Sequence, residues 1–293
     1  MRIVFLGTPA FAVPSLQRVA PEVVAVYTQP DRPRGRGQEL AMPPVKETAL
    51  RLGIPVQQPL KIRAVVDELR VCNADVMIVV GYGQIIPQSI LDISPLGIIN
   101  VHASLLPKYR GAAPIQWAIA QGENRTGVTT MRINAGLDTG DMLLKWETEI
   151  GAEETAVELS ERLAVAGADL LRRTLDDLPR MIPQPQDDAQ ATYAPILKKE
   201  DGLIDWSRPA REIANRVRGF QPWPGCYTFT GGKKLGIWKA RAIEGSLPPG
   251  AVGAGFRVGT GAGLLEVIEV QPEGKRRMNA AAFLSGHRVE TLG

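Results

Sequence analysis

The stretch from residue 98 to residue 116 constrains the fold most, because within a few residues it changes from an apolar strand to a helix. Its sequence is IINVHASLLPKYRGAAPIQ. Side chains alternate along a strand, so Asn100 and His102 should point to the same side at the strand's carboxyl end. Ligands of open α/β sheets bind at that end. An amide and an imidazole there can both donate hydrogen bonds to one small oxygen atom.

Apolar runs and helical patterns alternate up to residue 178, which predicts an α/β domain with a mostly parallel sheet. We expect strands at residues 2–6, 23–27, 55–57, 75–80, 98–102, 127–133 and 142–149. The last of these has an alternating pattern, which is typical of an antiparallel strand at a sheet edge. We expect helices at residues 10–20, 45–52, 62–70, 113–120 and 153–178.

The pattern changes after residue 178. Residues 179–205 hold several prolines and acidic pairs, which indicates a linker. Beyond it, glycine turns separate short strands, and such spacing predicts a small β-barrel. We expect these strands at residues 225–229, 234–240, 251–258 and 263–270. We place the domain boundaries within and at the end of the segment 179–205, so the first domain covers residues 1–189, the linker proper residues 190–205 and the second domain residues 206–293.

The formal net charge of +3 is distributed unevenly. Residues 206–293 carry 13 Lys and Arg against 6 Asp and Glu, whereas residues 1–197 carry 19 against 22. A basic second domain is compatible with a polyanionic partner. It is equally compatible with a domain that is merely basic and soluble, because charge alone does not identify a partner.

Composition excludes several classes of protein. The chain is 44% hydrophobic and 22% charged, which is typical of a soluble globular protein, and no apolar run is long enough to span a membrane. The first strand follows Met1 so closely that we expect no signal segment. Cys72 and Cys226 lie far apart, which favours a reducing cytoplasm over a disulfide. With only His102 and His287 beside them, they make no metal-ligand cluster, so we expect no metal.

Asp138 is the candidate partner of His102. It lies in the glycine-bounded loop GLDTGD at residues 136–141, and a carboxylate near the imidazole would fix its tautomer or hold it protonated. Taken alone, these residues leave a plainer interpretation open, because an Asp between glycines is usually a turn former. Asp138-Thr139-Gly140 also matches the tripeptide of aspartic proteases. That site needs a second Asp-Thr-Gly, which the sequence lacks.

Several motifs together resemble one enzyme family, the formyltransferases that use 10-formyltetrahydrofolate. The motifs are Gly7-Thr8-Pro9-x-Phe11-Ala12, Asn100-x-His102, Ser104-Leu105-Leu106-Pro107, Tyr109-Arg110-Gly111, Pro114-Ile115 and Gly136-Leu137-Asp138-Thr139-Gly140-Asp141. The resemblance is strongest to the members that formylate methionyl-tRNA. Residues 29–37, QPDRPRGRG, look like the insertion loop of those members. The segment IANRVRGFQPWPG at residues 213–225 resembles their second domain.

The resemblance implies a Rossmann-like catalytic domain followed by an OB-type barrel. It implies that a cytoplasmic monomer transfers the formyl group of 10-formyltetrahydrofolate to the amino group of methionine on initiator methionyl-tRNA, without a metal. The catalytic residues that it implies are Asn100, His102 and Asp138. The residues that it places beside tetrahydrofolate are Ser104, Leu105, Leu106 and Pro107.

Basic residues in two segments are expected to contact the tRNA. In the family the insertion loop wedges into the acceptor stem, and the resemblance gives this role to Arg36, with Arg34 beside it. The run Lys275, Arg276 and Arg277 is the densest positive charge in the second domain. We expect it to contact phosphates, which position a nucleic acid without reading its sequence.

Two other functions remain open at this point. A non-catalytic RNA-binding protein would explain the basic tail but not Asn100, His102 and Asp138. A formyltransferase acting on a sugar nucleotide or a purine precursor would explain these three residues, but such enzymes generally lack the insertion loop. Formyl transfer by the purified protein, with and without tRNA, discriminates among the three.

Overall fold

The computed structural model describes residues 1–34 and 39–293, which form two compact units. The first unit comprises residues 1–111, 127–148 and 160–193. The second comprises residues 112–126, 149–159 and 194–293. Helix α5 (Pro114–Ala120) therefore belongs to the same unit as the carboxyl-terminal part of the chain.

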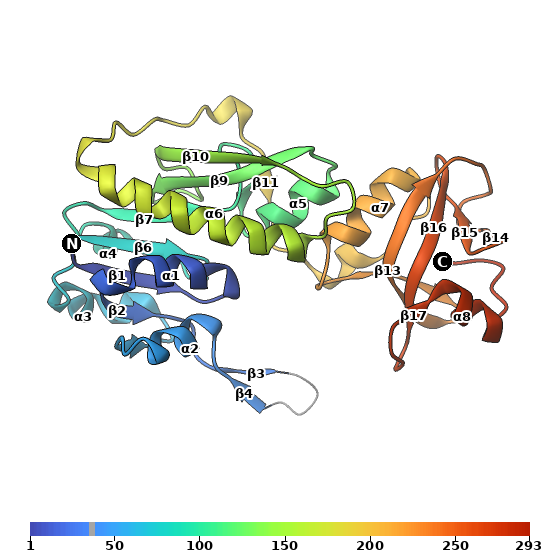
Figure 1. Cartoon of the computed structure of the whole chain (residues 1–293), viewed down its shortest axis with the longest axis horizontal. Helices are drawn as coiled ribbons and strands as arrows, with labels where there is room; N and C mark the ends of the chain where they lie inside the picture. Colours follow the sequence, from blue (N-terminus) through green and yellow to red (C-terminus); the bar gives the residue numbers. More distant parts are fainter. Residues whose placement is uncertain (35–38) are drawn as a thin grey trace. The chain divides into compact units, whose positions relative to one another are not determined.

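The first unit is built on a seven-stranded sheet (Figure 1). In order across the sheet its strands are β10 (Met142–Glu149), β9 (Arg125–Arg132), β7 (Ile98–His102), β6 (Val76–Val80), β1 (Ile3–Gly7), β2 (Val23–Tyr27) and β5 (Val56–Gln57). Strands β7, β6, β1, β2 and β5 pair in parallel, and β9 runs antiparallel to β7. The predicted mostly parallel sheet is confirmed, and β10 lies at its edge as expected.

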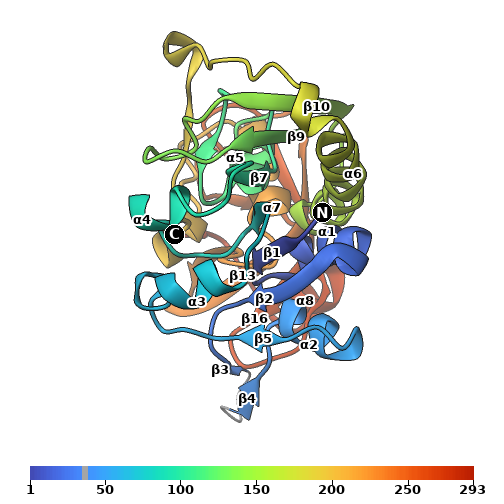
Figure 2. The same cartoon turned by 90° about the vertical axis from the view of Figure 1, so that its left-hand side faces the viewer.

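Helices cover both faces of this sheet. Figure 2 shows α1 (Val13–Val19), α2 (Pro44–Arg51) and α6 (Ala156–Asp177) on one side, and α3 (Val66–Val71) and α4 (Gln88–Leu91) on the other. Two expected helices are shorter than predicted. A 3-10 turn at Ala10–Ala12 precedes α1, and another at Ile62–Ala64 precedes α3.

The two faces of the sheet bury different side chains, because neighbouring residues of a strand point in opposite directions. On the α3 and α4 side, Leu69 and Ile90 pack in one apolar cluster with residues of β1 and β6 such as Leu6 and Met77. On the α6 side, Gly167 allows a close approach, since a Cβ there would lie 3.0 Å from a methyl carbon of Val101. Val101 therefore faces α6, and its neighbours on β7 face away from it.

The segment at residues 29–44 is more regular than predicted. Strands β3 (Arg32–Arg34) and β4 (Glu39–Ala41) pair antiparallel, with Arg32 opposite Ala41. The richness of residues 29–44 in proline, glycine and charge predicts a loop with no regular element, and that prediction is wrong for these six residues. A two-stranded ribbon uses only one edge of each strand, so it tolerates Pro33, which cannot donate a backbone hydrogen bond.

The second unit contains an antiparallel sheet and three helices. Its strands are β12 (Cys226–Thr230), β13 (Lys233–Ile243), β16 (Leu264–Pro272), β15 (Arg257–Gly259) and β14 (Val252–Gly253), with β17 (Met278–Asn279) paired to β16. Helices α7 (Ala210–Gly219) and α8 (Ala280–Gly286) join α5 in this unit. Phe220, Phe256 and Phe283 are among its buried core residues. The predicted OB-type barrel is not confirmed, because no pairing that closes the sheet is found among the described residues.

A short ribbon completes the description of the strands. β8 (Arg110–Gly111) pairs with β11 (Tyr193–Ala194). β11 lies in the segment interpreted as a linker, which also contains 3-10 turns at Asp188–Gln190 and Lys199–Gly202. Over residues 1–34 and 39–293, no helix combines the length and the apolar character needed to cross a membrane.

Substitution of a buried residue of α6 tests its packing on the sheet. Leu163 is fully buried, whereas Val165 on the same helix is 57% exposed. Leu163→Ala should lower the free energy of unfolding by about 2–5 kcal/mol, because it removes apolar contacts and leaves a cavity. The matched Val165→Ala should change it by less than about 0.5 kcal/mol. Urea unfolding measures both, and equal losses would contradict the buried position of Leu163.

Candidate active site

The three residues expected to form the site come together at the carboxyl end of β7. Asn100 Nδ2 lies 3.5 Å from Asp138 Oδ1, and His102 Nδ1 lies 3.7 Å from Asp138 Oδ2. The backbone N–H of Gly111 donates to the same Oδ2 at 2.8 Å. The alternation along β7 produces this arrangement, since Val101 packs toward α6 and the residues on either side of it point to the opposite face.

The imidazole of His102 is held by a backbone carbonyl. The side chain is 6% exposed, and its Nε2 lies 2.9 Å from the oxygen of Tyr109. A carbonyl oxygen can only accept a hydrogen bond, so Nε2 carries a proton. Nδ1 is therefore the nitrogen that faces Asp138, and in the neutral ring it bears the free lone pair.

The chain around Tyr109 is shaped to present that carbonyl. Tyr109 has a φ of +60°, a left-handed conformation that non-glycine residues rarely adopt. Its N–H donates to Thr192 Oγ1 at 2.9 Å, and the N–H of Arg110 donates to the Thr192 carbonyl at 2.9 Å. Neighbouring contacts of this kind are what maintain an uncommon backbone conformation.

The loop that carries Asp138 is held by a residue that the sequence did not indicate. Asp138 has a φ of +52°. The amide of Gln186 donates to the carbonyl oxygens of both Asp138 and Gly140, each at 2.8 Å. Gln186 lies in the segment interpreted as a linker, where no periodicity or motif marks it as part of a site.

The turn expected beside tetrahydrofolate is partly turned into the protein. Ser104 Oγ donates to the Lys108 carbonyl at 2.6 Å, and Leu106 is fully buried with Met131 and Met142. Leu105 and Pro107 are half-buried, so part of each side chain is accessible to a ligand.

A buried threonine and a lysine fix the backbone of this turn. Thr129 Oγ1 donates to the carbonyl of Ser104 at 2.7 Å and accepts from the N–H of Leu106 at 3.2 Å. Lys145 Nζ donates to the Leu106 carbonyl at 2.6 Å, and desolvation lowers the pKa of that ammonium. The turn is thus tied to β9 and β10.

A cavity of about 460 Å³ opens at the carboxyl ends of β1, β2 and β6. Its lining includes Thr8, Gln29, Met42 and the segment Gly81–Gly83. Val79 of β6 pairs with Asn100 of β7, so this cavity lies one strand away from the residues around Asp138. Burial raises the pKa of Tyr82 to about 12, which keeps its hydroxyl neutral. The position at strand ends is the one where open α/β sheets bind ligands.

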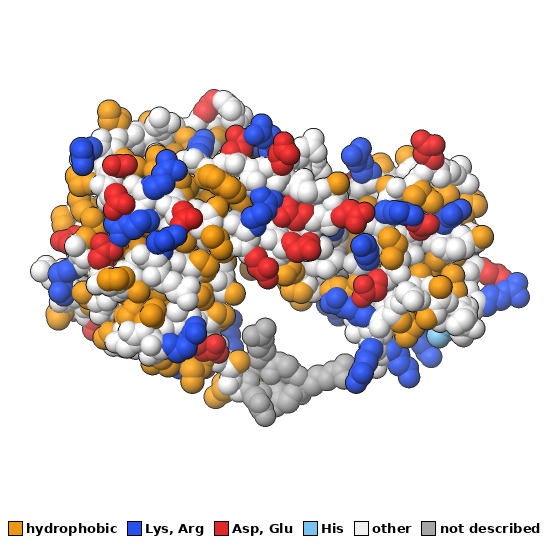
Figure 3. All heavy atoms as spheres, viewed as in Figure 1, with side chains coloured by type: hydrophobic (Ala, Val, Ile, Leu, Met, Phe, Trp, Pro, Cys, Tyr) orange, Lys and Arg blue, Asp and Glu red, His pale blue; other side chains and the backbone are white. Residues whose placement is uncertain are grey.

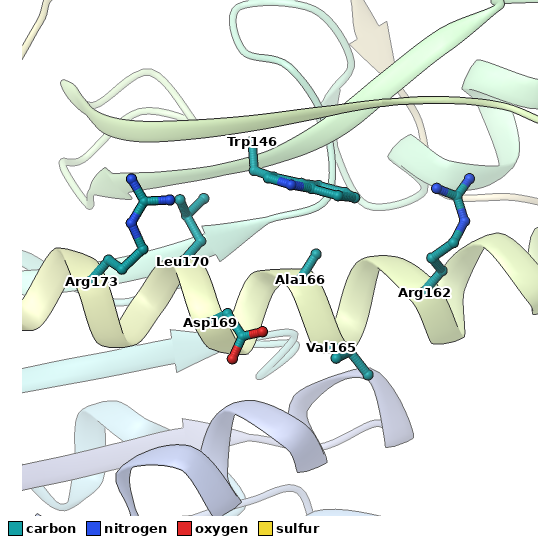
Figure 4. Close-up of a pocket in the computed structure, with 7 residues that line it drawn as sticks. All are labelled: Trp146, Arg162, Val165, Ala166, Asp169, Leu170 and Arg173. Atoms are coloured by element: carbon teal, nitrogen blue, oxygen red, sulfur yellow. The ribbon is translucent and has the colours of Figure 1, made fainter.

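A separate hollow of about 590 Å³ lies between β10 and α6 (Figure 4). Figure 4 shows the indole of Trp146 above the helix, with Arg162 and Arg173 toward the two ends. None of the residues expected at the site lines this hollow. It is therefore distinct from the site at the end of β7.

The residues expected to contact tRNA are placed only in part. Arg36 lies outside the described residues, and Arg34 ends β3. Lys275, Arg276 and Arg277 are exposed in the turn between β16 and β17. The Arg277 guanidinium carbon lies 3.3 Å from the centre of the Trp238 ring, a cation–π contact. Figure 3 shows Lys and Arg side chains gathered around β13 and β17.

The described part of the chain contains no group of three or more His, Cys, Asp or Glu side chains arranged to hold a metal ion. The site itself presents hydrogen-bond donors, an imidazole and a carboxylate. These groups can stabilise an oxyanion and move a proton.

Two family models match the chain in succession. Residues 1–175 match the model described as formyl transferase, and residues 196–288 match the model described as formyl transferase, C-terminal domain. The chain belongs to the formyltransferase family. The resemblance inferred from the sequence motifs is thus confirmed.

Relatives of this formyltransferase match it over its full length. One from Solibacter usitatus is 60% identical, covering 100% of this chain and 99% of its own, and it is named methionyl-tRNA formyltransferase. One from Citrifermentans bemidjiense, with the same name, is 52% identical and covers 100% of this chain and 96% of its own.

A solved structure shares the fold of this formyltransferase. It is an N-formyltransferase from Helicobacter canadensis in complex with folinic acid and dTDP-3-aminofucose. The match has a TM-score of 0.70 at 17% identity and covers 95% of this chain and 100% of that one. At this identity the likeness shows the fold alone.

Proposed function

We propose that this formyltransferase transfers the formyl group of 10-formyltetrahydrofolate to the amino group of methionine on initiator methionyl-tRNA. The full-length relatives that are 52–60% identical carry the name of this activity. The observation that carries the chemistry is the convergence of Asn100, His102 and Asp138 at one strand end. An acyl-transfer site needs oxyanion donors and a proton carrier, and these side chains can supply both.

His102 is the proton carrier in this proposal. Because Nε2 is engaged by the Tyr109 carbonyl, Nδ1 accepts the proton that the methionine amine loses when it attacks the formyl carbon. The imidazolium that forms lies 3.7 Å from the Asp138 carboxylate, which stabilises its charge. The carbon–nitrogen bond to N10 of the donor then breaks, and the same proton goes to N10.

Asn100 is the donor to the oxyanion. Its amide has two N–H groups, of which one is directed to Asp138 Oδ1 at 3.5 Å. The other is available to the formyl oxygen, which gains negative charge as the carbon becomes tetrahedral. A donor fixed before the reaction needs no reorganisation at that moment, and its loss typically costs about 2.7–4 kcal/mol.

The substrates are assigned to two parts of the chain. We assign tetrahydrofolate to the turn of Ser104, Leu105, Leu106 and Pro107, which follows directly on His102. We assign the tRNA acceptor end to Arg34, which ends β3, and to Arg36 of the insertion loop. We assign the tRNA phosphates to Lys275, Arg276 and Arg277. In this assignment, residues 1–189 form the catalytic domain and residues 206–293 form an OB-type domain that binds tRNA. The enzyme acts as a cytoplasmic monomer, in keeping with a role in translation initiation.

The alternatives are less well supported. A sugar-nucleotide acceptor has the support of the dTDP-3-aminofucose complex, but that protein shares only 17% of its residues with this chain. A non-catalytic RNA-binding protein would have no use for the three converging side chains. The proposal would be overturned if this protein transferred formyl groups to a sugar amine and not to charged tRNA.

The first prediction concerns the three residues at the end of β7. Charged initiator tRNA incubated with the protein and 10-formyltetrahydrofolate should gain the mass of one formyl group. Asn100→Ala, His102→Ala and Asp138→Ala should each lower turnover by about two orders of magnitude, with little change in the thermal midpoint. His287→Ala, which removes the other histidine, is the control and should leave turnover unchanged. A variant of the three that keeps normal turnover has no part in the mechanism.

The insertion loop gives a second prediction. Arg36→Ala should lower kcat/KM for charged initiator tRNA about tenfold or more, because a specific arginine contact is worth roughly 1–3 kcal/mol. Folate affinity, measured by titration, should hardly change. Arg63→Ala removes an exposed arginine outside the loop and should have no effect on either quantity. A joint loss of tRNA transfer, folate affinity and thermal stability would instead indicate a structural role for Arg36.

The basic run gives a third prediction, on salt dependence. Phosphate contacts do not depend on sequence, so replacing Lys275, Arg276 and Arg277 together by Ala should lower the affinity for all tRNAs about equally. Each phosphate contact also releases a counterion, which makes the affinity depend on salt. The slope of log affinity against log salt should become shallower by about 1 for each residue that contacts a phosphate. The control is Arg241→Ala with Arg257→Ala, since both arginines already pair with Glu266. An unchanged slope in the triple variant would show that the run does not contact tRNA.

A further inference from the structure

We propose that Gln186 and Arg110 are positioning residues that hold the Asp138 loop in its working geometry, an inference that rests on the proposed function. Gln186 binds the loop through its main chain. Its Nε2 donates to the carbonyl oxygens of Asp138 and Gly140, both at 2.8 Å. The two protons of one amide thus bind two carbonyl oxygens of the same loop, from residues two positions apart.

Arg110 fixes the orientation of that amide. Arg110 Nε donates to Gln186 Oε1 at 3.0 Å. Rotating the amide by half a turn would direct its NH2 group at the guanidinium and leave the two loop carbonyls facing an oxygen. The guanidinium itself is 2% exposed and is held on its other side by Asp188, at 2.7 Å from Arg110 Nη2. A buried guanidinium with a fixed fork of donors leaves little freedom to the group that it binds.

Arg110 also lies between the two residues whose backbones hold the site. Before it, the Tyr109 carbonyl accepts from His102 Nε2. After it, the Gly111 N–H donates to Asp138 Oδ2 at 2.8 Å. The chain from Tyr109 to Gly111 thus contacts the imidazole and the carboxylate through its backbone. Through the Arg110 side chain and Gln186, it also contacts the backbone that carries the carboxylate.

The segment that carries Gln186 is anchored independently of the loop. Gln184 and Met142 exchange two backbone hydrogen bonds, each of 2.8 Å. On the other side, Asp187 accepts from the N–H of Ala189 and caps a 3-10 turn. The amide of Gln186 therefore presents its donors from a fixed base, as a positioning group requires.

The need for such support follows from the loop's own conformation. Asp138 has a φ of +52°, which is unfavourable for a residue with a side chain. Within the loop, Asn134 Oδ1 accepts from the Gly136 N–H at 3.0 Å and from Thr139 Oγ1 at 2.9 Å. Neither bond involves the backbone carbonyls of Asp138 and Gly140, which are the groups that Gln186 binds. Without Gln186, the Asp138 carboxylate would keep the bond from the Gly111 N–H, but the main chain of its loop would lose two hydrogen bonds and the carboxylate could shift relative to His102.

The test is a pair of substitutions at Gln186 with a control on the same segment. Gln186→Leu keeps the size of the side chain and removes all three hydrogen bonds. Gln186→Glu keeps the acceptor for Arg110 and removes both donors to the loop. Each should lower kcat by about 10–100-fold, the usual effect of losing a group that orients an active-site ligand. KM for tRNA and folate affinity should stay within twofold. The Gln190 amide donates to Asp187 Oδ2 within its own turn at 2.8 Å, so Gln190→Leu should leave kcat unchanged.

A double-substitution cycle separates positioning from a merely structural role. In an Asp138→Ala background, Gln186→Leu should change kcat less than twofold, because its effect passes through the missing carboxylate. Effects that multiply would overturn the inference, as would normal kcat in either single variant. If Gln186→Leu fails to fold, Gln186→Glu, which keeps the bond from Arg110, supplies the measurement.

The outcomes also distinguish the inference from the proposed function. If the wild-type protein formylates charged tRNA and the Gln186 variants are equally active, only the positioning role is overturned. A wild-type protein that transfers no formyl group to charged tRNA overturns the proposed function, and the inference with it.

Discussion

The hydrogen bond from His102 Nε2 to the carbonyl of Tyr109 is the constraint on which the chemistry of the site depends. It fixes the proton of the neutral ring on Nε2, so the nitrogen that can take up a proton is Nδ1, on the side of Asp138. The carbonyl is available because Tyr109 adopts a left-handed backbone held by Thr192. A main-chain conformation outside the strand therefore determines which ring nitrogen faces Asp138 with a free lone pair.

The distance between His102 and Asp138 has a chemical meaning of its own. At 3.7 Å, Nδ1 and Oδ2 are too far apart for a direct hydrogen bond, while Oδ2 accepts from the Gly111 N–H at 2.8 Å. The carboxylate is thus bound by a neutral donor and still stabilises an imidazolium by its charge. In the proposed mechanism, Nδ1 uses its free lone pair to accept the proton of the amine, which a close ion pair with Asp138 would not allow.

Local sequence patterns predicted the part of this arrangement that follows from strand geometry. The period of two along β7 places Asn100 and His102 on one face, and the apolar runs predicted where the strands of the first sheet lie along the chain. The pattern did not predict Gln186, because the two backbone hydrogen bonds between Gln184 and Met142 bring it to Asp138 across more than 40 residues of chain. It also missed the β3–β4 ribbon, whose pairing tolerates proline.

The second sheet shows a different limit. Residues 251–258 were expected as one strand, but Phe256 has a φ of +56°, and the chain forms the separate short strands β14 and β15. Residue alternation specifies which face of a strand is buried, and it does not specify which edges pair. The difference between an open sheet and a closed barrel lies in those edges, so the spacing of short strands predicted a barrel that the pairing of the described strands does not show, and only its OB type depended on the family resemblance.

One short segment supports both reactive side chains of the proposed mechanism. Gln186 holds the backbone of Asp138, and Thr192 holds the backbone whose carbonyl binds His102. The stability of the sheet depends on other residues, such as Val101 against α6, which lie on the opposite face of β7. Stability and catalytic geometry therefore depend on separate sets of contacts. A change in the segment from 186 to 192 can alter the geometry while the sheet remains folded, whereas a change in the core of β7 alters both.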